Sequence, residues 1–269
     1  MTSKSLRNSI VIGAVLALAL TGCTKKTEAK ATITFGVDAT YAPNEYKDAN
    51  GKVVGWDIEL GDALAAQMGR TPKYVVATFD NIIPGVIGGK YDAGLSSFSD
   101  TPERQKQVDF VDYYSAGIQW AAAKGGNVDP NNACGLTVSV ENGTTEILDD
   151  LPMKSKACTD AGKPAIKLLG FDTQDLASQA VVAGRADAMS ADSPITQNLV
   201  IESKGKLELV GAPYDVVPYG IVVAKDNTAL SSEMQTAFQA IMDNGTYAEI
   251  LKKWGVEAGA VSSITLNGK

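Results

Sequence analysis

Histidine is absent from the 269 residues of this chain, and cysteine occurs only three times. Histidine is the commonest general base and a common metal ligand near neutral pH, so its absence counts against most hydrolase triads and zinc sites. Basic residues are outnumbered by acidic ones, 24 to 31, and the formal net charge is -7 with a pI of about 4.8. A negative chain does not suit a phosphate backbone. We therefore expect no nucleic-acid partner, no metal and no other cofactor.

Long apolar runs are also scarce, and the clearest one lies at the N-terminus. Lys4 and Arg7 provide a positive start, and about a dozen largely apolar residues follow from Ile10 to Leu20. A run of this length is too short to span a bilayer but suits the core of a signal peptide.

The residues that follow this run, Leu20-Thr21-Gly22-Cys23, resemble the bacterial lipoprotein cleavage box. The resemblance implies a signal peptide over residues 1–22, lipidation of Cys23 and attachment to the extracytoplasmic face of the cell membrane. A short membrane anchor with an incidental cysteine is the alternative. The polar residues 23–30 are then expected to form a flexible tether.

The two remaining cysteines, Cys134 and Cys158, form an even pair. Outside the cytoplasm such a pair usually forms a disulfide. Two buried free thiols are the alternative that the sequence leaves open.

Strand and helix patterns alternate along the chain. Residues 33–37 alternate apolar and polar, as in a half-buried strand, while Leu60, Leu64 and Met68 follow a helical period that ends at Gly69. A second strand at 74–77 and a second helix at 82–87 continue the series. Alternation of this kind predicts an α/β fold with a largely parallel sheet.

A short internal correspondence suggests two related units. Residues 89–93 (Gly-Lys-Tyr-Asp-Ala) recur at 184–188 as Gly-Arg-Ala-Asp-Ala, each after an apolar helical segment. Eight residues beyond the glycines lie Ser97 and Asp192, respectively. Because ligands in open α/β sheets bind at the carboxyl ends of strands, we expect both residues to face one cleft. A chance match in a common motif is the alternative.

The chain is expected to cross between two lobes twice, through extended segments at 118–124 and 216–225. This interpretation gives lobe 1 two segments, 31–120 and 217–269, and leaves 121–216 as lobe 2. The helical patterns at 232–244 and 247–254 would return to lobe 1.

Arg104 follows the segment Ser96-Ser97-Phe98-Ser99-Asp100-Thr101-Pro102-Glu103. Asp100 can cap a helix that starts at Pro102, and Glu103 favours the first turn. Serine hydroxyls, free N–H groups and a guanidinium would then meet at a strand end, which suits an anion. Without further context, however, such an arginine is more often a solvated helix residue.

Four stretches give that context: Gly36–Pro43, Gly55–Leu60, Ser96–Phe110 and Gly245–Val256. In this order they resemble the family 3 extracellular solute-binding proteins, the polar amino-acid receptors of ABC importers. The resemblance covers the chain from Ile33 onward. It implies a two-lobed, periplasmic-binding-protein-like fold of type II, with a mixed sheet flanked by helices in each lobe and two hinge strands.

Carried over position by position, the resemblance implies a site for a free amino acid. Arg104 would pair with the α-carboxylate, helped by the hydroxyl of Ser99 and the N–H of Thr145. Asp192 would bind the α-ammonium together with the backbone carbonyl of Ser97.

Four further residues would surround the ligand's side chain. Tyr41 and Trp56 would form aromatic walls, while Asp38 and Glu141 would form an acidic subsite that favours lysine, arginine, ornithine or glutamine over glutamate. A structural hydrogen-bonding role for Asp38 and a solvated loop charge at Glu141 are the alternatives. The chain departs from the common pattern at Asn44, where an aromatic residue is usual, and at Trp56, where phenylalanine or tyrosine is commoner.

The resemblance also implies partners. We expect a monomer held at the membrane by its lipid, which delivers its ligand to an ABC permease and ATPase and is not an enzyme. A cleft enzyme similar to cyclohexadienyl dehydratase and a ligand-sensing module are the alternatives.

Overall fold

The computed structural model describes residues 1–2 and 31–269. Nearly all of the predicted signal peptide, the lipidation site Cys23 and the predicted tether 23–30 lie outside the described residues. Within the described part, no helix combines the length and apolar character needed to cross a bilayer.

One mixed sheet of nine strands runs through the molecule in the order β5-β1-β6-β11-β7-β10-β8-β9, with β12 also paired to β7. Its strands are β1 (Thr32–Val37), β5 (Thr71–Val76), β6 (Ala93–Ser99), β7 (Val108–Ala123), β8 (Thr137–Glu141), β9 (Lys167–Phe171), β10 (Ala188–Asp192), β11 (Leu207–Ala224) and β12 (Ala260–Leu266). A small second sheet joins β2 (Thr40–Tyr41), β3 (Glu45–Lys47) and β4 (Val53–Val54).

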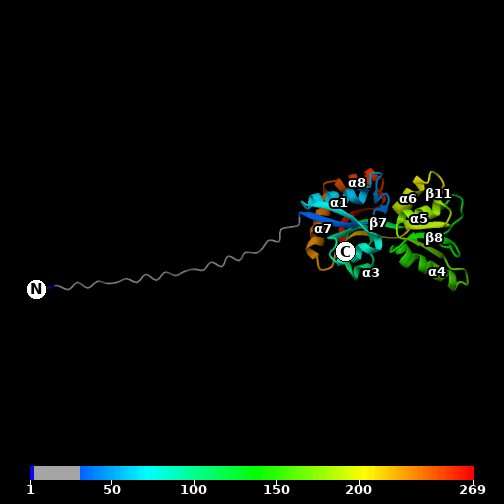
Figure 1. The fold of residues 1–269 in the computed structure, drawn as a ribbon, viewed down its shortest axis with the longest axis horizontal. Helices are drawn as coiled ribbons and strands as arrows, with labels where there is room; N and C mark the ends of the chain where they lie inside the picture. The colour runs from blue at the N-terminus through cyan, green and yellow to red at the C-terminus, as the bar shows by residue number, and fades with distance from the viewer. Residues whose placement is uncertain (3–30) are drawn as a thin grey trace.

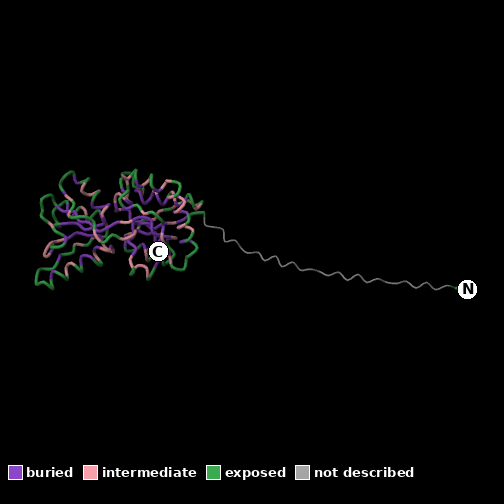
Figure 2. The backbone as a smooth tube through the Cα atoms, turned by 180° about the vertical axis from the view of Figure 1, so that it is seen from behind, coloured by how far each residue is buried: buried purple, intermediate pink, exposed green. Residues whose placement is uncertain are grey.

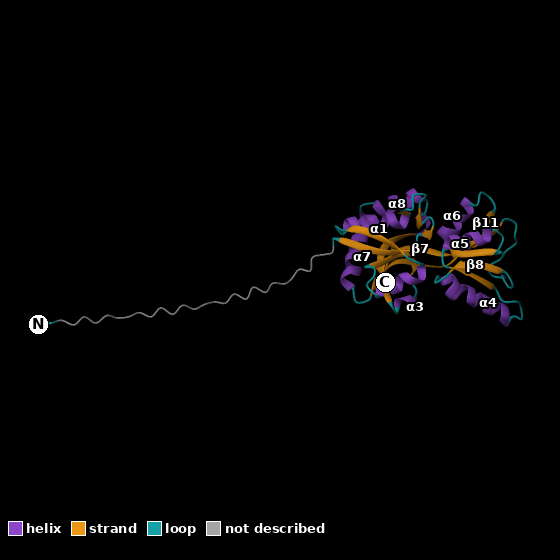
Figure 3. Cartoon of the chain, in the orientation of Figure 1, coloured by secondary structure: helices purple, strands orange, loops and turns teal. Residues whose placement is uncertain are grey.

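Helices flank the large sheet in two groups (Figures 1 and 3). The α-helices are α1 (Trp56–Gln67), α2 (Ile82–Ile87), α3 (Pro102–Gln105), α4 (Leu151–Asp160), α5 (Gln174–Val182), α6 (Ser193–Glu202), α7 (Thr228–Asp243) and α8 (Thr246–Trp254). Shorter turns are η1 (Phe79–Asn81), the π-helical η2 (Glu146–Asp150) and η3 (Glu257–Gly259).

Figure 1 separates two lobes: α1, α3, α7 and α8 lie in lobe 1, and α4, α5 and α6 lie in lobe 2. Strands β7 and β11 belong to both, because β7 pairs with β12 near its start and with β10 near its end. The predicted hinge segments are therefore parts of two much longer strands. The register between them is irregular from Val210 to Val217. The predicted boundaries of the lobes, after residues 120 and 216, fall inside these continuous strands and stay a prediction.

Separate hydrophobic cores stabilise the lobes, and Figure 2 shows buried chain in the interior of both. The main core of lobe 1 includes Leu60 and Leu64, the predicted inner face of α1, together with Phe238 on α7. Lobe 2 has a smaller core around Trp120 and Val138. Each fully buried side chain of this size contributes about 1.5–3 kcal/mol of transfer free energy.

The two predicted related units share the same backbone bonds. In the first unit the N–H of Lys90 donates to Gly85 O at 2.8 Å, and in the second the N–H of Arg185 donates to Ala180 O at 2.8 Å. The aspartates that follow, Asp92 and Asp187, make matching bonds. A carboxylate oxygen of each accepts a backbone N–H at or near the start of the neighbouring strand. This shared geometry brings the ends of β6 and β10 to equivalent places.

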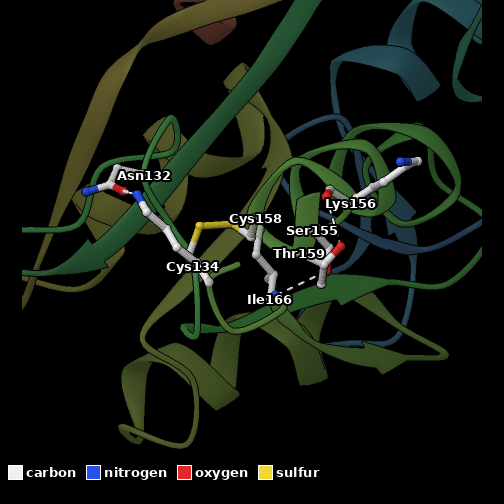
Figure 4. Close-up of a disulfide and its surroundings, with 8 residues drawn as sticks. Asn132, Cys134, Ser155, Lys156, Cys158, Thr159 and Ile166 are labelled. Carbon is white, nitrogen blue, oxygen red and sulfur yellow. Dashed lines mark hydrogen bonds between the residues drawn. A yellow bond between two sulfur atoms is a disulfide. The ribbon is translucent and has the colours of Figure 1, made fainter. Parts of the chain in front are cut away.

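The structure places Cys134 and Cys158 in a disulfide, as the sequence predicted for an extracytoplasmic chain. Figure 4 shows that it joins the segment before β8 to helix α4, on which Lys156 and Thr159 also lie. On the same side of the bridge, the N–H of Ile166 donates to Ser155 Oγ at 3.1 Å. The bridge therefore lies entirely within lobe 2.

Candidate functional site

A cavity of about 10 Å³ lies between the lobes. This volume is near the minimum for one water molecule, about 10–15 Å³, so an amino acid can enter only after the lobes separate. The residues that line it come from both lobes: Tyr41, Phe79, Ser97, Ser99, Arg104, Thr144, Thr145, Glu146 and Asp192. Six of the nine predicted ligand-binding residues are thus brought together here. The other three, Asp38, Trp56 and Glu141, do not line this cavity.

Arg104 reaches the cavity from α3. The N-cap of this short helix is Thr101, whose hydroxyl accepts the N–H of Arg104 at 3.3 Å, so the predicted cap at Asp100 was wrong by one residue. Asp100 instead accepts a bond from the side chain of Gln105 at 2.8 Å. The cap fixes the direction in which the helix presents the arginine.

The guanidinium of Arg104 bridges the two lobes. Its Nη1 donates to Ser99 O at 2.9 Å in lobe 1, and its Nη2 donates to Gly143 O at 3.0 Å in lobe 2. The ring of Phe79 lies 5.4 Å from the guanidinium carbon, a cation–π distance. Burial lowers the pKa of Arg104, while the nearby charges of Glu146 and Asp192 act in the opposite direction. The group therefore remains a cation with fixed donors.

Asp192 lies across the cavity, at the end of β10 and at the N-cap of α6. The hydroxyl of Tyr41 donates to its Oδ2 at 2.7 Å. Burial raises the pKa of Asp192, and the hydrogen bond from Tyr41 and the charge of Arg104 counteract this rise. A half-buried arginine and a buried aspartate thus line one cavity from opposite lobes.

Ser97 has an unusual backbone. Its φ is 52°, in the left-handed region that non-glycine residues rarely occupy, which costs about 1–3 kcal/mol. Neither neighbouring strand has a register partner for it, because β1 pairs with β6 up to Gly94 and β11 pairs with Phe98 and Ser99. The end of β6 therefore turns Ser97 toward the cavity.

The lobe 2 wall starts at a helix N-terminus. Thr145 precedes the π-helical η2, which continues directly into α4, so N–H groups at this start have no partner within the helix. The hydroxyl of Thr144 donates to Glu141 O at 2.9 Å and fixes the turn. Such a start favours an anionic group.

Buried carboxylates lie next to the cavity. Both side-chain oxygens of Glu141 and Oε1 of Glu146 have no hydrogen-bond partner among the described residues. Burial raises the pKa of Glu141 well above its usual value, and the charges of Asp38 and Glu146 add to the rise. Burial also raises the pKa of Glu146 to about 8, with a further contribution from Asp192. These groups create a region in which a cation would be stabilised.

Asp38 is buried but already bonded. Its Oδ1 accepts the N–H of Thr40 at 2.9 Å and the hydroxyl of Thr40 at 2.6 Å. Glu141, by contrast, is only 1% exposed and is therefore not a solvated loop charge.

Trp56 does not form a wall of this cavity. It is fully buried in the core of lobe 1, with its ring 4.7 Å from that of Tyr114. Its indole N–H donates to Asn44 Oδ1 at 2.7 Å. Trp56 was expected in the site because of its position in a family motif. The motif does not reveal that its side chain points into the core of lobe 1.

Sequence reasoning missed three lining residues, Phe79, Thr144 and Glu146. Phe79 lies in the short turn η1, which has no periodic pattern that could mark it. Thr144 and Glu146 flank the predicted Thr145, so the helix start itself was a signal that could have identified both. Phe79 and Tyr41 are the two aromatic residues that line this cavity, whereas Tyr41 and Trp56 were the expected pair.

Comparisons with known proteins agree with this geometry. The sequence profile described as bacterial extracellular solute-binding proteins, family 3, matches residues 33–257. The arginine-binding protein ArgT of Corynebacterium glutamicum is 36% identical over 240 residues, which are 88% of this chain and 79% of that protein. The ABC transporter arginine-binding protein 1 of Escherichia coli K12 is 34% identical over 89% of this chain and 97% of its own length.

Among solved structures, an ancestral arginine-binding protein bound to arginine superimposes with a TM-score of 0.77. It is 33% identical and covers 84% of this chain and 98% of its own. The predicted fold, a two-lobed periplasmic-binding-protein-like α/β structure of type II, is thereby confirmed.

Proposed function

Because this chain belongs to the bacterial extracellular solute-binding proteins of family 3, we propose that it is the substrate-binding component of an ABC importer for amino acids. Its ligand is a free amino acid with a cationic or amide side chain, and arginine is the first candidate. The observation that carries this proposal is the pairing of opposite charges, Arg104 and Asp192, across one cavity between the lobes. A zwitterion presents the complementary pair of charges.

Arg104 and Asp192 each bind one of the two charged groups that all amino acids share, the α-carboxylate and the α-ammonium. Arg104 binds the α-carboxylate, because a guanidinium offers two parallel donors that match it, and Ser99 and the N–H of Thr145 add further donors. Asp192 binds the α-ammonium together with the carbonyl of Ser97. Because these groups come from both lobes, the ligand makes its full set of contacts only in the closed state and therefore favours closure.

The side chain of the ligand would extend toward the buried acids. Tyr41 and Phe79 line the cavity with aromatic rings, and Glu141 and Glu146 carry oxygens without partners. A buried carboxylate without a partner is costly, and pairing it with a cation offsets part of that cost. This arrangement supports arginine, lysine or ornithine over glutamate, with glutamine as the neutral ligand that can donate to the same oxygens.

We further propose that the chain is a lipoprotein. Lys4, Arg7 and the apolar run that follows support a signal peptide, and the sequence at 20–23 supports acylation of Cys23. The lipid would hold the protein as a monomer at the extracytoplasmic face, where it meets the permease and ATPase. The reported relatives are binding proteins, which favours a binding role over an enzymatic one.

A thermal-shift screen of the twenty amino acids, followed by calorimetry, tests the proposal. The chain from residue 31 onward, without signal peptide and tether, should show its largest shift with arginine, lysine, ornithine or glutamine. A larger shift with glutamate would contradict the acidic subsite, and no shift with any amino acid would contradict the function.

Glu146→Gln tests the subsite within the same experiment. Removing one buried negative charge should weaken arginine about tenfold, since a hydrogen bond to a charged group contributes about 1.5–3 kcal/mol. The affinity for glutamine should change little, so the ratio between the affinities for arginine and glutamine should become smaller. Equal losses for both ligands would show that Glu146 does not select the side chain. Glu202→Gln is the control, because Glu202 is an exposed residue of α6 outside this cavity.

A further inference from the structure

A buried polar cluster lies behind Ser97, on the side away from lobe 2. Asn44 and Trp56, the two positions at which the chain departs from the common family pattern, are both 0% exposed and contact each other. Glu45 and Asp57 are equally buried beside them. Neither Asn44 nor Trp56 lines the cavity, and Ser97 is the lining residue to which the side chain of Asn44 is hydrogen-bonded.

The direction of the hydrogen bonds in this cluster follows from the chemistry of its members. The indole N–H of Trp56 can only donate, so the atom of Asn44 that receives it at 2.7 Å is the amide oxygen. The amide nitrogen therefore points the other way and donates to Ser97 Oγ at 2.8 Å. Trp56 thus determines which way the Asn44 amide faces.

Ser97 in turn has no hydrogen left for the cavity. Its hydroxyl, which accepts from Asn44, donates to the carboxylate of Glu45 at 3.2 Å or of Asp57 at 3.3 Å. Its backbone N–H donates to Asp57 Oδ2 at 3.2 Å. With both hydrogens directed into lobe 1, Ser97 faces the cavity as an acceptor only.

We propose that Asn44, oriented by Trp56, is a positioning residue that holds Ser97 in its left-handed conformation, in which the backbone carbonyl of Ser97 is placed to accept from the ligand's α-ammonium. This inference rests on the proposed function, because it assigns the acceptor to that ammonium. It gives Asn44 and Trp56 one joint role. Together they position the ammonium-binding part of the site, which distinguishes an amino acid from a simple carboxylic acid.

The test uses Asn44→Leu, which is close in shape but has no hydrogen-bonding group, and the double variant Asn44→Leu/Trp56→Phe. Calorimetry measures the affinity for L-arginine and for its desamino analogue, 5-guanidinopentanoic acid. Asn44→Leu should weaken arginine about tenfold, because Ser97 loses the bond that holds its left-handed backbone and its carbonyl is no longer fixed toward the ammonium. The desamino analogue, which has no ammonium, should change by less than about twofold.

The double variant separates positioning from a purely structural role. It removes the unpaired indole N–H that Asn44→Leu leaves behind, so the thermal stability should recover, while the weakened affinity for arginine persists. Affinity that recovers together with stability would overturn the inference, as would equal losses for arginine and its desamino analogue. If the wild-type chain binds no amino acid, the proposed function is overturned. If the wild type and Asn44→Leu bind arginine with equal affinity, only the positioning role is overturned.

Discussion

The two lobes contribute to one cavity in different ways. On the lobe 1 side, Ser97 and Arg104 are held in place by hydrogen bonds to other groups of that lobe. On the lobe 2 side, Glu141 and Glu146 are equally buried but keep carboxylate oxygens without partners among the described residues. One side is a preorganised set of donors and acceptors, and the other holds buried carboxyl groups whose pKa values are raised, so that a bound cation would favour their ionised form.

This difference matches the two parts of an amino acid. The carboxylate and ammonium are the same in every candidate ligand, so a rigid set of groups can be built for them in advance. The side chain differs between ligands, and buried acids discriminate strongly because a cation removes their unfavourable burial while an anion increases it. We infer that Arg104 and Ser97 of lobe 1, together with Asp192 of lobe 2, mainly provide affinity for the class, and that Glu141 and Glu146 of lobe 2 mainly provide the choice within it.

The largest expected effect comes from breaking the lobe 1 side with Arg104→Ala. Removing one partner of a buried charge pair typically costs about 2–5 kcal/mol, so every amino acid ligand should bind well over tenfold more weakly while the fold survives. Calorimetry and circular dichroism measure the two effects. Glu103→Ala on the same helix is the matched control, because that side chain is 75% exposed. Near-native affinity in Arg104→Ala would contradict the assignment.

A second effect, on stability, should be confined to lobe 2. Replacing Cys134 and Cys158 by serine opens a loop with a sequence separation of 24, which should lower the free energy of unfolding by about 3 kcal/mol. Hydrogen exchange should accelerate in α4 and β8 and remain unchanged in α1 and α7. Equal acceleration in both lobes would show that they do not differ in this respect.

The smallest effect is a pH dependence of stability. The pKa of Glu146 is about 8 in the folded chain against an ordinary value of 4.5, so between these values the folded state binds a proton that the unfolded state releases. The stabilising contribution is complete below about pH 4.5 and is lost as the pH rises through about 8. The melting temperature without ligand should therefore fall by a few degrees from pH 5 to pH 8.

Glu146→Gln sharpens this measurement, because it removes the contribution of one lobe 2 acid. The fall should become smaller, although Asp57 and Asp112 of lobe 1, with pKa values raised by burial to about 6 and about 7, act in the same direction. An unchanged slope in Glu146→Gln would show that Glu146 does not contribute to the effect. Arginine should oppose the fall, since a bound cation favours the ionised carboxylates.

The sequence predicted the elements with strong local patterns. The helical period of Leu60 and Leu64 and the alternation at 33–37 reappear as α1 and β1. The long strands β7 and β11 were predicted only in part. The first half of β7 is buried on both faces and loses the alternation that marks a strand, whereas the first half of β11 is largely exposed and is defined by its pairing with β7. Their length depends on partners far away in the chain.

The candidate site divides in the same way. Ser97 and Asp192 follow a repeated local motif, which predicted their common position. Phe79 and Trp56 have similar chemistry, and only the packing of α1 and η1 decides which ring lines the cavity and which enters the core. Motif positions identify segments that approach a ligand, but tertiary packing decides the direction of each side chain.

The bonds that Tyr41 makes to Asp192 and that Arg104 makes to Gly143 have a consequence for uptake. They use the same charged groups that the ligand needs, so the protein carries its own competitor. A ligand must first outcompete these contacts, and its apparent dissociation constant rises in proportion as the open form becomes rarer. These two internal bonds thus help to set the external ligand concentration at which import begins. Weakening either bond would lower that concentration.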